Sequence, residues 1–249
     1  MTARGRRAGA SPPAPAVLYG RNPIHEAIRA GRRPVRRVWA TASAAREPWL
    51  SGVGVQIAEA AWIAERAGSD AHQGMCAEVG RYPYADEADL LAGRPDRAPL
   101  IVALDEVQDP QNVGAIARTA EAAGATGLVL PRHRSAEVTP AVAKASAGAV
   151  EHLPIARVRN LADFLADAKA AGCWCYGADA DATVPYDAPD YRGGVVLVLG
   201  AEGRGLRPRV AAACDELLSI PRRGHVESLN VSAASAVLVY EVLQRRGSS

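Results

Sequence analysis

The pattern of apolar and polar residues divides the chain near position 100. Upstream, the spacing predicts a small alternating unit with helices at 22–31 and 60–67 and strands at 35–41, 53–58 and 75–79. Proline, glycine and charged residues are then concentrated up to Pro99, which is typical of a connection between folded units. We therefore predict a first domain over 17–82 and a linker over 83–99.

Downstream of the linker, strand and helix patterns alternate to the end of the chain. We predict strands at 100–104, 126–130, 150–155, 173–177, 195–200 and 216–220, and helices at 112–123, 140–148, 161–171, 208–213 and 231–245. Val195 to Leu199 are five consecutive aliphatic residues, as expected of a strand buried on both faces of a parallel sheet. The alternation predicts an open, mostly parallel α/β sheet in a second domain, 100–249.

The formal charge is small but unevenly placed. Twenty-nine basic residues against 27 acidic ones give +2, which by itself argues against a nucleic-acid partner. Residues 1–37, however, contain nine arginines and one acid, Glu26, a charge of +8, and the remainder carries −6. Arginine binds phosphate in a bidentate way, although a GC-rich genome produces the same excess of arginine over lysine.

Simple features argue against several classes of protein. No apolar run reaches the roughly 20 residues that span a bilayer, and the first 16 residues lack the apolar core of a signal peptide. We predict that 1–16 is a disordered basic tail. The four cysteines, including Cys173 and Cys175 in an apolar strand-like run, have no partners at metal-ligand spacing. We expect buried thiols, no metal, no membrane association and a reducing, cytoplasmic setting.

Three polar clusters follow predicted strands, at the edge of the sheet where open α/β folds bind their ligands. The first, 105–118, opens the helix at 112–123. Asn112 is a candidate N-cap, and Arg118 follows within two turns, where it could share a face with the start of the helix. Taken alone, an arginine in a helix is usually a solvated surface residue.

The second cluster, 199–206, is rich in glycine, which lets a backbone approach a ligand closely. It does not match the dinucleotide pattern G-x-G-x-x-G, and by itself Glu202 is either an exposed loop acid or a placed carboxylate. The third cluster, 220–232, contains Ser228 and Asn230, and capping the last helix explains only one of them. No serine–histidine–aspartate triad or catalytic carboxylate pair is assignable.

Taken together, the three clusters resemble the three motifs of the SpoU/TrmH family of RNA ribose 2′-O-methyltransferases, of the SPOUT class. The matching patterns are N-x-G-x-x-x-R at Asn112, Gly114 and Arg118, L-G-x-E-G-x-G at 199–205, and I-P-x-x-G-x-x-x-S-L-N-V-S at 220–232. In the first domain, 19–23 (YGRNP) and 72–77 (HQGMCA) look like the substrate-binding domain of the RlmB-type subgroup, which methylates a guanosine in 23S rRNA. The resemblance covers about 17–246.

The resemblance implies a C-terminal SPOUT domain with a deep trefoil knot and a small L30e-like α/β substrate-binding domain. It implies S-adenosylmethionine as cofactor, 23S rRNA as partner and a homodimer that pairs through the knot region. Gly200, Ile220 and Leu229 match residues that surround the adenosyl group. The residues that match the catalytic set are Arg118, Asn112, Glu202, Ser228 and Asn230. Arg118 matches the proposed base, yet a guanidinium with a pKa above about 12 could equally hold a phosphate and stabilise the alkoxide.

Two positions of the third cluster depart from the family pattern. Arg222 stands where an apolar residue, often methionine, follows the proline, and Glu227 stands where small or polar residues are usual. The alternatives to methylation of 23S rRNA are therefore 2′-O-methylation of tRNA or of another rRNA position, as in resistance methyltransferases. A non-catalytic rRNA-binding assembly factor is the alternative outside enzymes.

Overall fold

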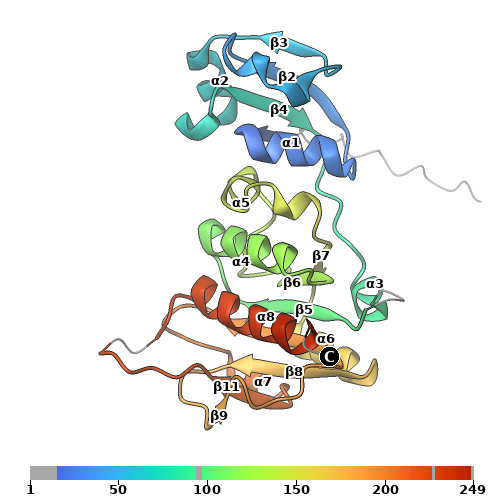
Figure 1. Ribbon diagram of the computed structural model, residues 1–249, viewed down its shortest axis with the longest axis vertical. Helices are drawn as coiled ribbons and strands as arrows, with labels where there is room; N and C mark the ends of the chain where they lie inside the picture. Colours follow the sequence, from blue (N-terminus) through green and yellow to red (C-terminus); the bar gives the residue numbers. More distant parts are fainter. Residues whose placement is uncertain (1–15, 94–96, 226–227, 248–249) are drawn as a thin grey trace, which may run out of the picture.

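The computed structural model describes residues 16–93, 97–225 and 228–247, and two α/β bodies stack along its long axis (Figure 1). The N-terminal body holds a four-stranded sheet with the order β1-β4-β2-β3. β4 runs antiparallel to β1 and β2, whereas β3 is parallel to β2. The elements are β1 (Ala16–Tyr19), α1 (Arg21–Ala30), β2 (Val35–Ala40), β3 (Val55–Ile57), α2 (Ala60–Ala67) and β4 (Met75–Val79).

The C-terminal body is built on a seven-stranded sheet with the order β7-β6-β5-β10-β8-β11-β9. Every pairing described in it is parallel. Its strands are β5 (Leu100–Asp105), β6 (Gly127–Pro131), β7 (Ile155–Val158), β8 (Cys173–Ala178), β9 (Val184–Pro185), β10 (Gly194–Gly200) and β11 (Glu216–Ser219). Its helices are α4 (Pro110–Ala122), α5 (Pro140–Ala145), α6 (Leu161–Ala170), α7 (Pro208–Ala211) and α8 (Val231–Gly247).

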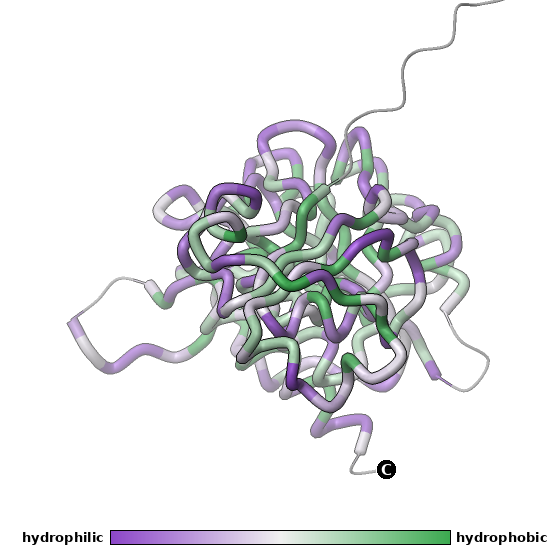
Figure 2. Tube along the Cα trace, turned by 90° about the horizontal axis from the view of Figure 1, so that it is seen from above, coloured by the Kyte–Doolittle hydropathy of each residue, from purple (hydrophilic) through white to green (hydrophobic). Residues whose placement is uncertain are grey.

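Both faces of this sheet are covered. Along β5, Leu100, Val102 and Leu104 join a core that includes side chains of α4 and α8, whereas Ile101 and Ala103 join a second core with α6 and α7. A strand buried on both faces needs apolar residues at every position, which explains the uninterrupted aliphatic run of β10 in the middle of the sheet. Apolar segments accordingly pass through the centre of the chain trace (Figure 2).

The predicted fold class is confirmed, but three local predictions are wrong. The strand expected at 150–155 lies at Ile155–Val158, because Val150 and Leu153 belong to the buried wall of a 3-10 turn, η4 (Ala149–Glu151), and its exit. The helix expected at 140–148 ends at Ala145. The N-cap of α4 is Asp109, whose carboxylate accepts a hydrogen bond from the Gln111 amide at 3.0 Å.

Three further elements carry too weak a pattern to be expected. These are β1, β9 and a short helix, α3 (Glu87–Ala92), within the predicted linker. The side chain of Leu90 on α3 is buried in the second core of the sheet, so this part of the connection packs on the C-terminal body. The basic tail predicted over 1–16 lies outside the described residues, apart from Ala16 in β1.

The two bodies meet at an interface that we call the interdomain seam, with residues 20–33, 72–74 and 80–84 on one side and residues 140–154 on the other. At its centre the side chains of Arg33 and Glu151 form a buried ion pair, with Nε donating to Oε2 at 2.9 Å. Tyr82 donates its hydroxyl to the Val150 carbonyl at 2.7 Å. His152 Nε2 lies 2.7 Å from a carboxylate oxygen of Glu26. The seam is therefore polar and specifically paired, with the Arg33–Glu151 pair buried at its centre.

Among the residues that the structure describes, no helix combines the length and the apolar character needed to cross a membrane.

Candidate active site

The glycine-rich cluster forms a tight loop at the carboxyl end of the central strand β10. A Cβ atom on Gly200 would lie 2.1 Å from the carbonyl carbon of Gly205, so the two ends of the loop touch backbone to backbone. The Gly205 amide donates to the Ala201 carbonyl at 2.9 Å, and Gly203 and Gly205 have positive φ angles of 72° and 64°. Glycine is required here because any side chain at 200 would open the loop.

The loop is anchored behind by a buried carboxylate. Asp105, at the end of the neighbouring strand β5, has no exposed surface. It accepts hydrogen bonds from the Arg207 backbone amide and from Arg207 Nε, both at 2.8 Å. The hydrogen bond to this carboxylate raises the pKa of the Arg207 guanidinium, and the two contacts fix the exit of the loop to the sheet.

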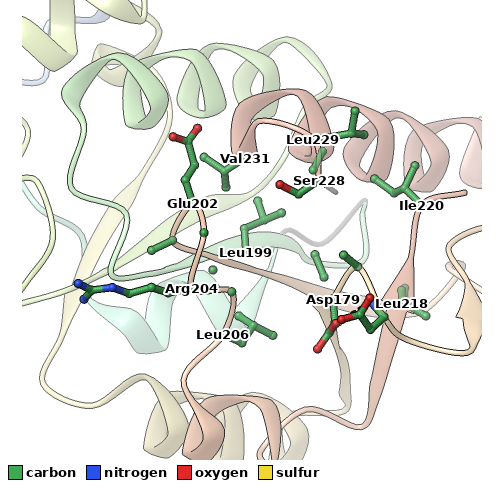
Figure 3. Close-up of a pocket in the computed structure, with 18 of the residues that line it drawn as sticks. Asp179, Leu199, Glu202, Arg204, Leu206, Leu218, Ile220, Ser228, Leu229 and Val231 are labelled. Atoms are coloured by element: carbon green, nitrogen blue, oxygen red, sulfur yellow. Dashed lines mark hydrogen bonds between the residues drawn. The ribbon is translucent and has the colours of Figure 1, made fainter. Parts of the chain in front are cut away.

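A cavity of about 760 Å³ opens in front of the loop (Figure 3). Its lining comes from the loop after β8 (178–181), from 199–206, and from Leu218, Ile220, Arg222, Ser228, Leu229, Val231 and Ala234. Leu199, Ile220 and Leu229 form an aliphatic wall, whereas Glu202 and Asp179 lie at opposite ends (Figure 3). The size suits a nucleotide-sized ligand that has an apolar ring and polar ends.

At the Glu202 end, three side chains from three elements form a closed set of hydrogen bonds, which we call the Asn112–Glu202–Asn230 triangle. Asn112 Nδ2, on α4, donates to Glu202 Oε1 at 3.1 Å. Asn230 Nδ2 donates both to the same carboxylate oxygen and to Asn112 Oδ1, the latter at 3.1 Å. Because a carboxylate only accepts, it dictates the orientation of both amides.

Asn230 is also the cap of the last helix. Its Oδ1 accepts from the Ser232 amide at 2.9 Å and from the Ser232 hydroxyl at 2.5 Å. One asparagine thus joins the start of α8 to the glycine-rich loop and to α4. Asp109 takes over the capping of α4, which leaves the Asn112 side chain free for the triangle.

Arg222, which departs from the family pattern, closes the far end of the cavity. Its Nη2 donates to the Ala180 carbonyl at 2.7 Å and lies 3.5 Å from an Asp181 carboxylate oxygen. It therefore ties the segment after β11 to the loop after β8. Glu227, the second departure, lies outside the described residues.

Arg118 is not brought into the triangle. Six residues after Asn112, it is rotated by about 120° around the helix axis, because each residue turns an α-helix by about 100°. Its side chain is exposed and makes no hydrogen bond or ion pair with any residue that the structure describes. Arg118 therefore lies on a different face of α4 from Asn112, although it is seven residues after Gln111 and so shares a face with that first-turn residue; its role in the site stays a prediction.

The other predicted residues do converge. Gly200, Ile220, Leu229, Ser228 and Glu202 all line the cavity, and Asn112 and Asn230 reach it through Glu202. The loop at 178–181 was missed, since only the strand order places β8 beside β10. Its signal in the sequence is a polar segment directly after an apolar strand. Within the described residues, no group of three histidine, cysteine or acidic side chains could hold a metal ion.

Comparison with known proteins agrees with this geometry. The model of the SpoU rRNA methylase family matches residues 99–240, and a model described as RNA 2′-O ribose methyltransferase substrate binding matches 17–85. The chain belongs to the SpoU rRNA methylase family. It is therefore an RNA methyltransferase of the SpoU/TrmH type, and its N-terminal body is the substrate-binding domain.

Relatives of this SpoU family member extend over both bodies. YacO of Bacillus subtilis, named as a TrmH family tRNA/rRNA methyltransferase, is 45% identical over 177 residues, which cover 70% of this chain and 71% of YacO. A Staphylococcus haemolyticus protein with the same kind of name is 35% identical over 92% of this chain and 96% of its own. The SpoU methyltransferase AviRb of Streptomyces viridochromogenes, solved in complex with the cofactor AdoMet, superimposes with a TM-score of 0.78 at 27% identity, covering 94% of this chain and 91% of AviRb.

Proposed function

We propose that this protein transfers a methyl group from S-adenosylmethionine to the ribose 2′-hydroxyl of a nucleotide in 23S rRNA, a guanosine. The observation that carries the proposal is that Glu202 belongs at once to the wall of the cavity and to the triangle with Asn112 and Asn230. A ligand site and a set of fixed polar groups therefore meet at one carboxylate. All three motifs contribute to that meeting point.

The cavity fits an adenosyl cofactor by size and by donor chemistry. Leu199, Ile220 and Leu229 offer an apolar wall for an adenine ring, and Gly200 lines the same cavity without a side chain to cover its backbone. Glu202 and Asp179 place carboxylates at the two ends, which suits a cationic ligand that also carries hydroxyl groups. The AdoMet complex of the related AviRb supports the same assignment.

When bound, S-adenosylmethionine supplies a methyl group that the ribose 2′-oxygen takes up with loss of its proton, leaving S-adenosylhomocysteine. The protein supplies orientation and charge stabilisation. The triangle keeps Glu202 in one position at the cavity edge, and Ser228 lines the same cavity. We assign Arg118 to stabilising the developing alkoxide or an adjacent phosphate, because a guanidinium is a strong cation and a poor base.

The N-terminal body supports RNA as the substrate. Its family model describes substrate binding by RNA 2′-O-methyltransferases, and its first elements carry Arg21, Arg29, Arg36 and Arg37 on the exposed surface. The proposal includes the deep trefoil knot, a cytoplasmic location and a homodimer. Tyr240 and Leu243 support the homodimer, because these large apolar side chains of α8 are 48% and 40% exposed and offer a face to a second copy.

The deciding experiment measures tritium transfer from labelled S-adenosylmethionine to unmodified 23S rRNA and to tRNA. We expect incorporation into 23S rRNA and a single ribose methylation, mapped by mass spectrometry of nuclease fragments. Incorporation into tRNA alone, or at a site other than a guanosine, would overturn the substrate assignment. No incorporation into any RNA would favour the non-catalytic assembly factor.

The Arg118→Ala variant tests the division of roles within the site. We expect methyl transfer to be lost while calorimetry shows unchanged binding of S-adenosylmethionine, because Arg118 lies outside the cavity lining. Arg192→Ala, which removes an exposed arginine on another part of the domain, is the matched control and should retain full activity. Retained turnover in Arg118→Ala would remove this residue from the mechanism.

A further inference from the structure

Two sequence motifs of the substrate-binding domain meet a lysine of the methyltransferase domain at the interdomain seam. The Gln73 side-chain oxygen accepts a hydrogen bond from the Arg21 backbone amide at 3.1 Å and another from Lys144 Nζ at 2.7 Å. Lys144 is the last but one residue of α5. Its ammonium lies directly over Gly20, where a Cβ atom would come within 2.5 Å of Nζ. The glycine is therefore what makes room for the cation.

Lys144 is unusual because its charge is partly buried and has no carboxylate partner. None of the ion pairs in the described parts of the chain includes it, and its hydrogen-bond partner there is a neutral amide. Burial lowers the pKa of the Lys144 ammonium, and no acidic group counteracts the effect. By contrast Lys169, the other lysine of the chain, lies 3.5 Å from an Asp215 carboxylate oxygen. A partly buried cation without a counter-ion is costly unless a ligand supplies the negative charge.

The Gln73 side chain next to Lys144 offers a second donor. The Gln73 side chain is exposed, and since its oxygen is taken by two donors, its NH₂ group remains for a ligand. The His72 ring accepts a hydrogen bond from the Gly74 amide through Nδ1 at 3.0 Å, which makes Nε2 its donor. The nearby carboxylate of Glu47 is paired with Arg21 Nη1 at 2.5 Å. The Lys144 ammonium and the Gln73 NH₂ group are thus two donors side by side, a combination that suits an anion.

A single helix–helix contact, between α5 and α4, connects Lys144 to the active site. α5 packs on α4, where a Cβ on Gly114 would lie 2.4 Å from the Ala145 Cβ. Gly114 is two residues after Asn112 of the triangle, and Ala145 is next to Lys144. Figure 1 shows α5, the start of α4 and the start of α8 along the same side of the molecule. RNA that reaches the cavity along this side passes Lys144.

We infer that Lys144 and Gln73 bind a phosphodiester group of the RNA substrate across the interdomain seam and so position the target nucleotide. This inference rests on the proposed function, because it assigns a substrate contact to the same reaction. Lys144 acts as a positioning residue that contributes to RNA binding and is remote from the reacting atoms. The phosphate would serve as the counter-ion for the Lys144 ammonium.

The test compares full-length Lys144→Met with the wild type in filter binding to a 23S rRNA transcript at several KCl concentrations. We expect about tenfold weaker binding at low salt. The slope of log K against log [KCl] should become shallower by about 0.7–0.9, the change for one lost phosphate contact. The KM for RNA should rise with kcat little changed, and Lys144→Arg should restore most of the affinity. Lys169→Met is the matched control and should leave both slope and affinity unchanged.

Two outcomes overturn the inference. One is an unchanged affinity in Lys144→Met, and the other is weaker binding with an unchanged salt slope, which would mean that Lys144 only holds the domains together. Both are readable without catalysis. They are thus distinct from failure of the proposed function, which would appear as absent methyl transfer by the wild type.

Discussion

Replacing Arg33 by methionine would leave Glu151 as a buried carboxylate without its partner. The two side chains are 3% and 1% exposed, and besides the pairing with Glu151 the Arg33 guanidinium donates to the Gly80 carbonyl at 3.4 Å. Breaking a buried ion pair from one side costs about 3–5 kcal/mol, because the remaining charge stays desolvated. Replacing both charges by apolar groups of similar volume is often close to neutral. We therefore expect Arg33→Met and Glu151→Met each to lose about 3–5 kcal/mol, and the double variant to lose about 1 kcal/mol.

Urea unfolding followed by tryptophan fluorescence measures this double-mutant cycle. Trp39, Trp49 and Trp62 lie in the substrate-binding domain and Trp174 lies in β8 of the other body, so a Trp174→Phe background makes the signal report the body that the seam holds in place. Arg192→Met is the matched control, since the Arg192–Asp190 pair is 72% and 62% exposed and should leave the midpoint unchanged. Losses below about 1 kcal/mol in both single variants, or a double variant that loses their sum, would refute the reasoning.

Two further predictions follow from individual contacts. Burial by itself would raise the pKa of Glu26, but hydrogen bonds from His152 and Arg29 outweigh it and lower the pKa below its ordinary value. The resulting contribution of Glu26 to stability is present above about pH 4.3 and is lost as the pH falls through the lowered pKa. His152→Ala should therefore move the midpoint of acid unfolding to higher pH. An unchanged midpoint would contradict this reasoning. Gly200→Ala drives a Cβ into the Gly205 backbone and should weaken S-adenosylmethionine binding at least about tenfold by calorimetry. Gly193→Ala, where a Cβ would meet nothing within 4 Å, should bind normally.

Much of the C-terminal fold was predictable because burial on both faces of a parallel sheet leaves a direct trace in the sequence. The uninterrupted apolar run from Val195 to Leu199 is an example, and it forms the central strand β10. A run of apolar residues was misleading where an element other than a strand buried them. Val150 and Leu153 suggested a strand, yet a 3-10 turn places them in the core beneath the seam.

The candidate site was predictable where one motif held all the information, and less so where two elements had to be placed in space. The glycine spacing around Glu202 indicated a tight loop, and the structure contains one. That Asp109 rather than Asn112 caps α4 follows from a contest between two neighbouring side chains, which spacing cannot decide. The orientation of Arg118 depends on which faces of α4 are covered by the sheet, α5 and α8, and these are long-range contacts.

The interdomain seam has a consequence for how a target could be chosen. Three side-chain contacts join the two bodies across the seam and leave it little freedom to rearrange. They are Arg33 with Glu151, Tyr82 with Val150, and His152 with Glu26. The distance between the substrate-binding surface and the cavity is thus set by the protein, in the manner of a ruler. An RNA whose fold already holds its nucleotides at that distance binds without an entropic cost of rearrangement. A flexible single strand loses conformational entropy when it is ordered on binding. The protein would then recognise its RNA target by three-dimensional structure more than by nucleotide sequence.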